Sequence, residues 1–193
     1  MISPSQHKPH NAPLTSVRGR IRAWIDAHAD KLGDDVLEVG SRLHAPDAWW
    51  ANNRDLALGK WTGVDMQPGD GVDLVCDVCD LPEAMNGRFS AVLCSEALEH
   101  VARPWVALRA LRDVLQADGW IIVTTLTSFP LHAFPDDFWR FTESGLRLLL
   151  TDAGFRNVTT AGGGRVDYLL NDHGEDGMTT MSCPMHVFGT AQC

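Results

Sequence analysis

The stretch 35–42 constrains the fold of this chain more than any other segment. It is a short apolar run, carried by Val36, Leu37 and Val39, that leads directly into Gly40. Such a run suits a strand buried on both faces, as in parallel sheets. Gly40 allows a sharp turn and a close approach of the backbone to a ligand at the strand's carboxyl end. Taken alone, the pattern fits an ordinary turn equally well, so its weight comes from the segments that follow.

Strand and helix patterns alternate along the rest of the chain. Further apolar runs predict strands at 61–66, 72–77, 89–95, 120–125, 157–160 and 186–190, with a Gly- and Asp-rich connection at 162–177. Apolar residues at helical spacing predict helices over 17–32, 101–115 and 142–153. This alternation predicts an α/β fold, Rossmann-like and doubly wound, with a mostly parallel sheet of about seven strands and helices on both faces.

The length and charge of the chain limit its domains and partners. A chain of 193 residues fits a single domain, which we expect at 16–193 after a flexible N-terminal arm at 1–15. The formal charge of −9 disfavours nucleic acid as a partner. No apolar window is long enough to span a bilayer, and five cysteines without an evident pairing favour a reducing compartment, so we expect a cytoplasmic protein.

Polar side chains stand at the ends of four consecutive predicted strands. They are Glu38, Asp65, Asp77 and Ser95. In a parallel sheet these ends share one edge, and a carboxylate after the second strand can accept both hydrogen bonds of a ribose diol. Each acid taken singly is equally well explained as a turn or helix-cap residue. Together they predict a ligand-binding edge.

The same segments resemble the class I S-adenosylmethionine-dependent methyltransferases, in particular the group that methylates small molecules. The resemblance rests on five stretches, at 36–40, 63–65, 77–82, 89–101 and 111–122. It implies that S-adenosyl-L-methionine is the cofactor, with Asp65 on the ribose and Asp77 and Val78 at the adenine. The remaining implied cofactor contacts are Glu38, Gly40, Ser41, Met66 and Ser95, and His100 would border the sulfonium pocket.

Arg42 departs from the family pattern. The first loop of the family usually carries a second glycine at this position, and an arginine side chain there would crowd the cofactor or reach over it. A cofactor-binding or regulatory module without transfer activity therefore stays open beside the methyltransferase. A nicotinamide dehydrogenase is disfavoured, because the spaced glycines of its G-x-G-x-x-G motif are absent from the sequence.

The aromatic-rich loop at 129–141 follows the fifth predicted strand and should cover the same edge. A neutral histidine there can take a proton from an acceptor near pH 7, so we interpret His132 and Asp136 as catalytic, with His100 as the competing base. The alternative is that the aromatic residues anchor the loop and Arg140 forms a salt bridge. The acceptor is expected to be a small molecule or glycan-like, and a homodimer stays open.

Two patterns suggest a metal and are judged incidental. Cys76 and Cys79 straddle a strand end without a second pair to complete a zinc site, and Cys183, His186 and His173 form a set of low specificity. We therefore expect no metal ligands.

Overall fold

The computed structural model describes residues 17–43, 53–56, 59–132, 136–171 and 178–193. The expected arm at 1–15 and much of the loop after the first strand lie outside these residues. The division into that arm and a domain at 16–193 stays a prediction.

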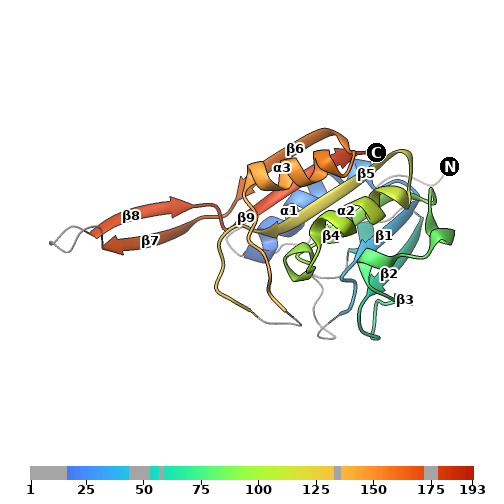
Figure 1. The fold of residues 1–193 in the computed structure, drawn as a ribbon, viewed down its shortest axis with the longest axis horizontal. Coiled ribbons are helices and arrows are strands. Elements are labelled where there is room, and N and C mark those ends of the chain that lie inside the picture. Colours follow the sequence, from blue (N-terminus) through green and yellow to red (C-terminus); the bar gives the residue numbers. More distant parts are fainter. Residues whose placement is uncertain (1–16, 44–52, 57–58, 133–135, 172–177) are drawn as a thin grey trace.

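A seven-stranded sheet in the order β3-β2-β1-β4-β5-β9-β6 forms the centre of the fold (Figure 1). The five strands from β3 to β5 run parallel, and β9 is antiparallel to both of its neighbours. The strands are β1 Asp35–Val39, β2 Lys60–Asp65, β3 Leu74–Val75, β4 Phe89–Ser95, β5 Leu115–Leu126, β6 Arg156–Gly163 and β9 His186–Gln192. The predicted doubly wound, mostly parallel sheet is confirmed.

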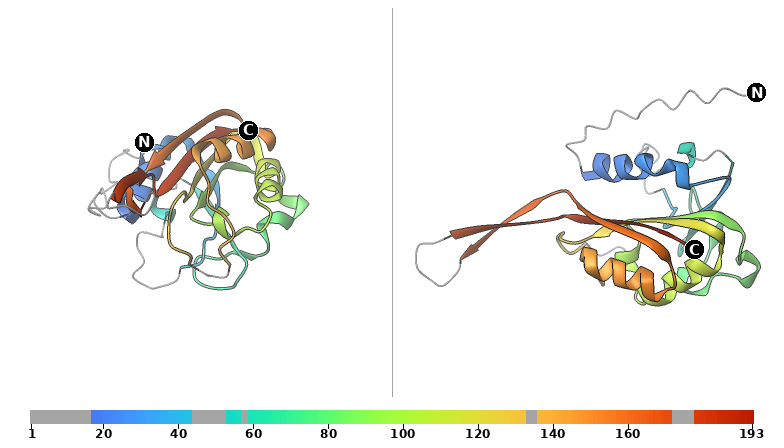
Figure 2. Two further views of the ribbon diagram at one scale, coloured as in Figure 1. Left: turned by 60° about the vertical axis from the view of Figure 1, so that its left-hand side comes forward. Right: turned by 90° about the horizontal axis from the view of Figure 1, so that it is seen from above.

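Helices cover both faces of the sheet (Figure 2). Helix α1, Val17–Ala27, lies on one face, whereas α2, Pro104–Asp113, and α3, Glu143–Asp152, lie on the other. Alternate residues of each central strand supply the two cores: Val36 of β1 packs on the side of α1, and Leu37 packs on the side of α2 and α3. Both faces are buried, which explains why these strands read as continuous apolar runs.

Local signals placed several boundaries correctly. The fourth predicted strand, 89–95, coincides with β4. The hydroxyl of Thr142 accepts a hydrogen bond from the backbone N–H of Gly145 at 3.0 Å, so Thr142 is the expected N-cap of α3. The helix ends at Asp152, and Gly154, the expected stop, follows two residues later with a φ of +93° that suits glycine.

The largest differences from the expectation lie in β5 and after β6. Strand β5 begins at Leu115 rather than at residue 120, because Leu115 pairs with Phe89 before a register shift brings Trp120 opposite Ala91. The connection expected at 162–177 contains the strand β7 Val166–Asn171, and a second unexpected strand, β8 Met178–Cys183, follows it.

Strands β7 and β8 pair only with each other in the described sheets and project from the body of the molecule as an arm (Figures 1 and 2). The glycine-rich start of this segment gives no alternating apolar signal, so sequence patterns missed the arm. None of the described helices is long and apolar enough to cross a membrane.

Candidate active site

The carboxyl ends of the parallel strands open onto a pocket of about 440 Å³. Its walls come from the turns after β1, β2 and β3, from the segment after β4, and from the loop between β5 and α3. Most of the residues predicted from the sequence line it: Gly40, Asp65, Met66, Asp77, Val78, His100 and Asp136. Glu38, Ser41, Ser95 and His132 stand just outside this lining.

The turn after β1 is built around Gly40. Its φ is +70°, and a side chain there would place a Cβ atom 3.1 Å from that of Ala97, so the turn packs closely against the segment after β4. The backbone N–H groups of Gly40 and Ser41 both donate to the carbonyl of Val64, at 2.9 and 3.2 Å, which ties the turn to β2. The Ser41 hydroxyl is buried and has no hydrogen-bond partner among the described residues. The glycine turn thus forms part of the pocket lining.

Asp65 ends β2 with its carboxylate on the pocket wall. One oxygen accepts from the backbone N–H of Gln67 at 2.9 Å, and the other accepts from the backbone N–H of Arg42 at 3.3 Å. Only backbone donors occupy the carboxylate among the described residues, and a carboxylate has lone pairs left for further donors. Met66 follows and is 61% exposed.

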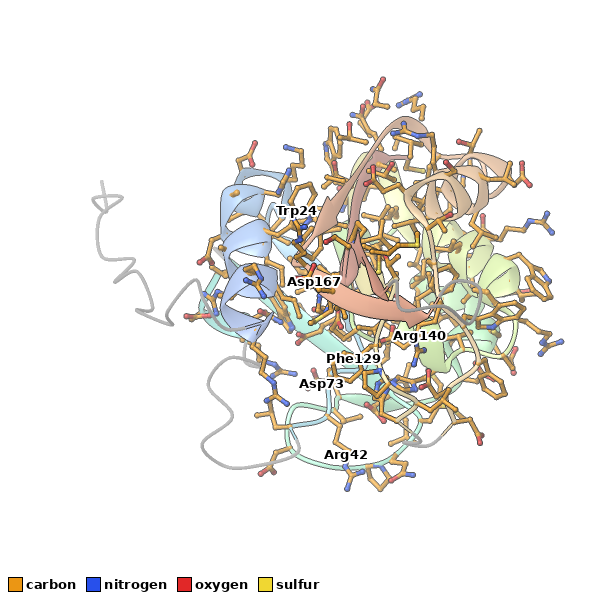
Figure 3. The ribbon with its side chains drawn as sticks, turned by 90° about the vertical axis from the view of Figure 1, so that its left-hand side faces the viewer. Trp24, Arg42, Asp73, Phe129, Arg140 and Asp167 are labelled. Carbon is orange, nitrogen blue, oxygen red and sulfur yellow. The ribbon has the colours of Figure 1, made fainter. Side chains whose placement is uncertain are left out.

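Arg42 lines the pocket, and its side chain is held by the loop after β2 (Figure 3). Its guanidinium donates to the side-chain oxygen of Gln67 at 2.8 Å, and its aliphatic stem lies against Gly69. The crowding of the cofactor expected from an arginine at this position stays a prediction.

Asp77 caps a short helical turn, Val78–Asp80, by accepting from the backbone N–H of Cys79 at 2.8 Å. Val78 is buried, and Cys76 and Cys79 join it on the pocket wall. Burial, with the negative charge of Asp77, raises the pKa of both thiols. The two cysteines are free thiols that line the pocket.

Glu38 is buried behind the pocket. Its two oxygens accept hydrogen bonds from the Asn53 side chain and from the Trp61 indole, both at 2.8 Å. Burial raises the pKa of this carboxyl to about 7. The contact with the methionine portion implied by the resemblance stays a prediction.

The segment after β4 adds Glu96, which sequence reasoning did not single out. Its φ of +50° is unusual for a residue other than glycine, and it lines the pocket. One of its oxygens lies 3.3 Å from the Nε2 atom of His186, which is buried on β9. Ser95, just before it, shares a hydrogen bond of 2.9 Å with Thr124 of β5.

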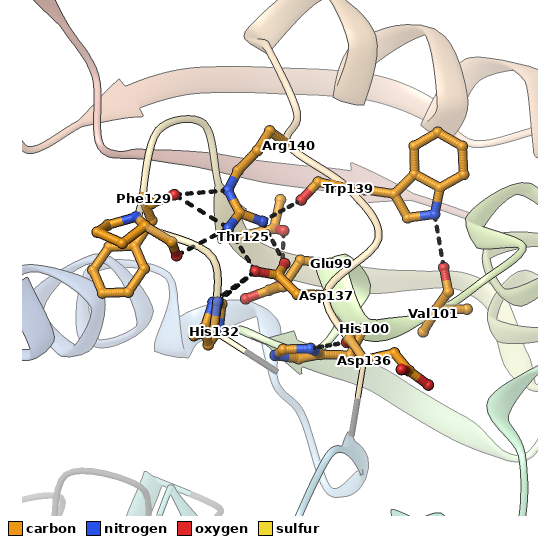
Figure 4. A network of polar contacts seen from close by, with 11 residues as sticks. Glu99, His100, Val101, Thr125, Phe129, His132, Asp136, Asp137, Trp139 and Arg140 are labelled. Atoms are coloured by element: carbon orange, nitrogen blue, oxygen red, sulfur yellow. Dashed lines mark hydrogen bonds and ion pairs between the residues drawn. The ribbon is translucent and has the colours of Figure 1, made fainter. Parts of the chain in front are cut away.

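A polar network holds the loop between β5 and α3 against the pocket (Figure 4). Asp137, with only 4% of its side chain exposed, forms an ion pair with Arg140 through both carboxylate oxygens, at 2.5 and 2.7 Å. It also accepts from the backbone N–H of His132 at 2.8 Å and lies 3.1 Å from the Nδ1 atom of that ring. Hydrogen bonds from Arg140 and His132 hold the pKa of Asp137 well below its usual range.

Glu99 lies beneath this network and is fully buried. One oxygen accepts from the Thr125 hydroxyl at 2.8 Å, and the other has no hydrogen-bond partner in the described part of the chain. Burial, with the nearby charge of Glu96, raises the pKa of Glu99. Its position inside the most family-like stretch, 89–101, was the only sequence signal for this residue.

Glu99, His100 and His132 place one ligand-type atom each within 4.8 Å of one another. A set of this kind can hold a cation. The positive charge of Arg140 also acts on Glu99, and its guanidinium is paired with Asp137. The expectation that these residues hold no metal, and the interpretation of both imidazoles as catalytic, stay predictions. Of the other set considered, His186 pairs with Glu96 instead, and His173 lies outside the described residues.

A doubly wound sheet with an acid-lined pocket at the carboxyl ends of its strands defines a nucleotide-cofactor-binding α/β protein. Residues 14–160 match the sequence profile of the methyltransferase domain family, which covers more than half of the chain. The chain therefore belongs to this family, the class I S-adenosylmethionine-dependent methyltransferases, as the resemblance implied.

Relatives and solved structures agree with this placement. The chain is 31% identical over 128 residues to the ubiquinone biosynthesis O-methyltransferase of Chromobacterium violaceum, covering 59% of this chain and 53% of that protein. It thus spans about half the length of the curated relatives that it matches. The fold is similar to a Burkholderia thailandensis 1,6-didemethyltoxoflavin-N1-methyltransferase solved with S-adenosylhomocysteine, at 20% identity and a TM-score of 0.61, covering 91% and 77% of the chains. It is also similar to the [4+2]-cyclase SpnF, at 17% identity and a TM-score of 0.58, covering 89% and 80%.

Proposed function

We propose that this chain transfers the methyl group of S-adenosylmethionine to a small-molecule acceptor. The observation that carries the proposal is the pocket itself. The residues that line it include the Gly40 turn, Asp65 and Asp77, together with His100 and Asp136. We assign the first group to the cofactor and the second group to the acceptor, so that one cavity holds both.

The residues present fit this cofactor. The turn at Gly40 lines the pocket, and the buried Ser41 hydroxyl next to it in the chain lacks a partner among the described residues. The Asp65 carboxylate can accept hydroxyl donors, and Val78 offers an apolar surface beside the polar Asp77. Asp65 would hold the ribose hydroxyls, with Met66 beside the adenine and with Asp77 and Val78 at its edge.

When bound, the cofactor supplies a methyl group already activated by a sulfonium. The protein then has to align the acceptor with that methyl group and exclude water. Phe138 on the pocket wall serves the second task. His100, His132 and Asp136 belong to the acceptor side, and an imidazole there receives a proton if the acceptor must lose one.

The acceptor and the assembly are finer proposals. An oxygen acceptor is the first class to test, because the curated relatives carry the name O-methyltransferase. A glycan-like acceptor and a homodimer remain expectations from the sequence. A module that binds the cofactor without transferring the methyl group is the second candidate, and the observation that favours it is Arg42 in the pocket lining, at the position where the family usually carries a glycine.

The test is binding of S-adenosylhomocysteine, measured by calorimetry and by thermal unfolding. A ligand that binds only the native state raises the melting temperature. Asp65→Ala should weaken binding about ten- to a hundredfold, because charge-assisted hydrogen bonds contribute about 1.5 to 3 kcal/mol. Asp70→Ala is the matched control, since Asp70 is an exposed acid on the same loop and lies outside the pocket lining.

Failure to bind S-adenosylhomocysteine would refute the proposal. Equal affinity in the Asp65 and Asp70 variants would show that the cofactor site is assigned to the wrong residues. Incubation with methyl-labelled S-adenosylmethionine and an acceptor extract then separates the two candidates. A methyltransferase transfers the label, whereas a binding module retains it on the cofactor.

A further inference from the structure

The orientation of the His100 ring is fixed by a backbone carbonyl. Its Nδ1 atom lies 2.5 Å from the carbonyl oxygen of Asp136 (Figure 4). A carbonyl oxygen only accepts hydrogen bonds, so Nδ1 must carry the proton. In the neutral ring the lone pair then belongs to Nε2.

His100 lines the pocket beside Phe138 and Asp136. Its other face meets His132, with the two rings edge to face and their centroids 4.8 Å apart. A half-buried imidazole with one nitrogen committed to the backbone can offer only its second nitrogen to an acceptor in the pocket. His100 thus satisfies the geometric requirement for a base more directly than His132, which stands outside the lining.

The hydrogen-bond partner of His100 is the carbonyl of Asp136, on the loop between β5 and α3. The position of this carbonyl depends on the contacts that hold the loop. The next residue, Asp137, ties Arg140 and His132 together through its buried carboxylate. Arg140 also donates to the carbonyls of Phe129 and Pro130, each at 3.2 Å. This ion pair therefore joins the beginning of the loop to its end, and we call Asp137 and Arg140 the clasp.

The clasp also docks the loop on the segment that carries His100. The backbone N–H of Phe138, next to Asp137, donates to the carbonyl of Glu99 at 2.9 Å. The Trp139 indole donates to the carbonyl of Val101 at 3.0 Å. The residues on both sides of His100 thus accept hydrogen bonds from the loop, and the clasp holds the donors in place.

We infer that His100 is the base for the methyl acceptor, in a tautomer fixed by the Asp136 carbonyl, and that Asp137 and Arg140 are the positioning residues that keep it so. The inference rests on the proposed function. His100 takes the acceptor's proton at Nε2, and the electron pair of that O–H bond remains on the acceptor oxygen. A lone pair of this oxygen bonds the methyl carbon, while the sulfur of the cofactor keeps the pair of the broken S–C bond.

Long-range ¹H–¹⁵N spectra of chelator-treated protein at pH 8 test the tautomer without an acceptor. His100→Gln and His132→Gln assign the two rings among the 8 histidines of the chain. We expect His100 to be protonated at Nδ1 and not at Nε2. A His100 ring protonated at Nε2, or averaged between both forms, would overturn the inference.

Asp137→Asn tests the clasp. We expect the His100 signals to average between tautomers and hydrogen exchange of the Phe138 amide to accelerate about tenfold or more, because a buried charge-assisted pair is lost. Affinity for S-adenosylhomocysteine should stay within about threefold, since the clasp lies on the acceptor side. Asp118→Asn is the matched control, because it breaks the exposed ion pair with Arg156 on another part of the surface.

The outcomes separate this inference from the proposed function. Unchanged His100 signals in Asp137→Asn would show that the clasp does not position His100. Stoichiometric shifts of the His100 and His132 signals on adding Zn²⁺ or Mg²⁺ would show that Glu99, His100 and His132 form a cation site instead. If the wild type does not bind S-adenosylhomocysteine while His100 is protonated at Nδ1, the proposed function alone is refuted. If Asp137→Asn does not fold, Arg140→Lys keeps the charge without the bidentate geometry and should show a weaker form of the same effects.

Discussion

The buried carboxyl of Glu38 makes the stability of this protein depend on pH, and Glu38→Gln should remove that dependence. Only 6% of Glu38 is exposed, and its pKa is raised from an ordinary 4.5 to about 7 because burial disfavours the charged form. A carboxyl with a raised pKa contributes its stability fully below pH 4.5. That contribution is lost as pH rises through about 7.

The magnitude follows from these two pKa values. One pKa unit corresponds to about 1.4 kcal/mol, so the contribution lost between pH 5 and pH 8 is about 2 to 3 kcal/mol. A glutamine keeps the shape of the protonated carboxyl and cannot ionise. It can be accommodated because the Asn53 side-chain oxygen is buried without a partner among the described residues, so a flipped amide could accept from the new N–H group.

The assay is denaturant-induced unfolding of the wild type and Glu38→Gln at several pH values from 5 to 8. The free energy of unfolding of the variant minus that of the wild type should rise by about 2 to 3 kcal/mol over this range. Glu83→Gln is the control, since Glu83 is exposed, and its difference from the wild type should stay flat. Other titrating groups, including Glu99, are common to both proteins and cancel in the difference.

If the free energies of unfolding of the wild type and Glu38→Gln vary with pH in parallel, this reasoning is refuted. Such a result would show that Glu38 has the same pKa in the folded and the unfolded state. The same variant tests the role implied by the family resemblance. A large loss of affinity for S-adenosylhomocysteine would place Glu38 in contact with the cofactor, whereas an unchanged affinity would confine it to the packing behind the turn.

Two further predictions concern the pocket and the arm. S-adenosylhomocysteine at ten times its dissociation constant should slow alkylation of Cys76 and Cys79 about tenfold, because both thiols line the pocket. Cys193 lies outside the lining and should react at the same rate with and without the ligand. A mass-spectrometric time course in which the ligand leaves the rates of Cys76 and Cys79 unchanged would contradict this prediction. Replacing residues 165–184 by a short turn should keep S-adenosylhomocysteine binding, because Gly163 and His186 already lie opposite each other on paired strands. Light scattering of the wild type and the shortened protein tests whether the arm holds a homodimer. Loss of the fold in the shortened protein would show that the arm is needed for folding.

The sequence by itself determined the order of the strands along the chain and the edge of the sheet at which the pocket lies. Short apolar runs such as 89–95 become strands because both of their faces are buried, and that requirement is visible in the composition of each run. Thr142 and Gly154 mark the ends of α3 through the local chemistry of helix caps. Asp65 and Asp77 reached the pocket because parallel strands share their carboxyl edge.

Only the tertiary structure decided which polar groups control one another. Glu38 is buried because Asn53 and Trp61, remote along the chain, close over it. In the loop between β5 and α3 the sequence favoured Asp136, yet the structure gives the buried ion pair to Asp137, and Asp136 contacts His100 through its carbonyl. Two adjacent aspartates look alike in a sequence. They differ in the structure because only the folded chain determines which carboxylate is buried and which cation it pairs with.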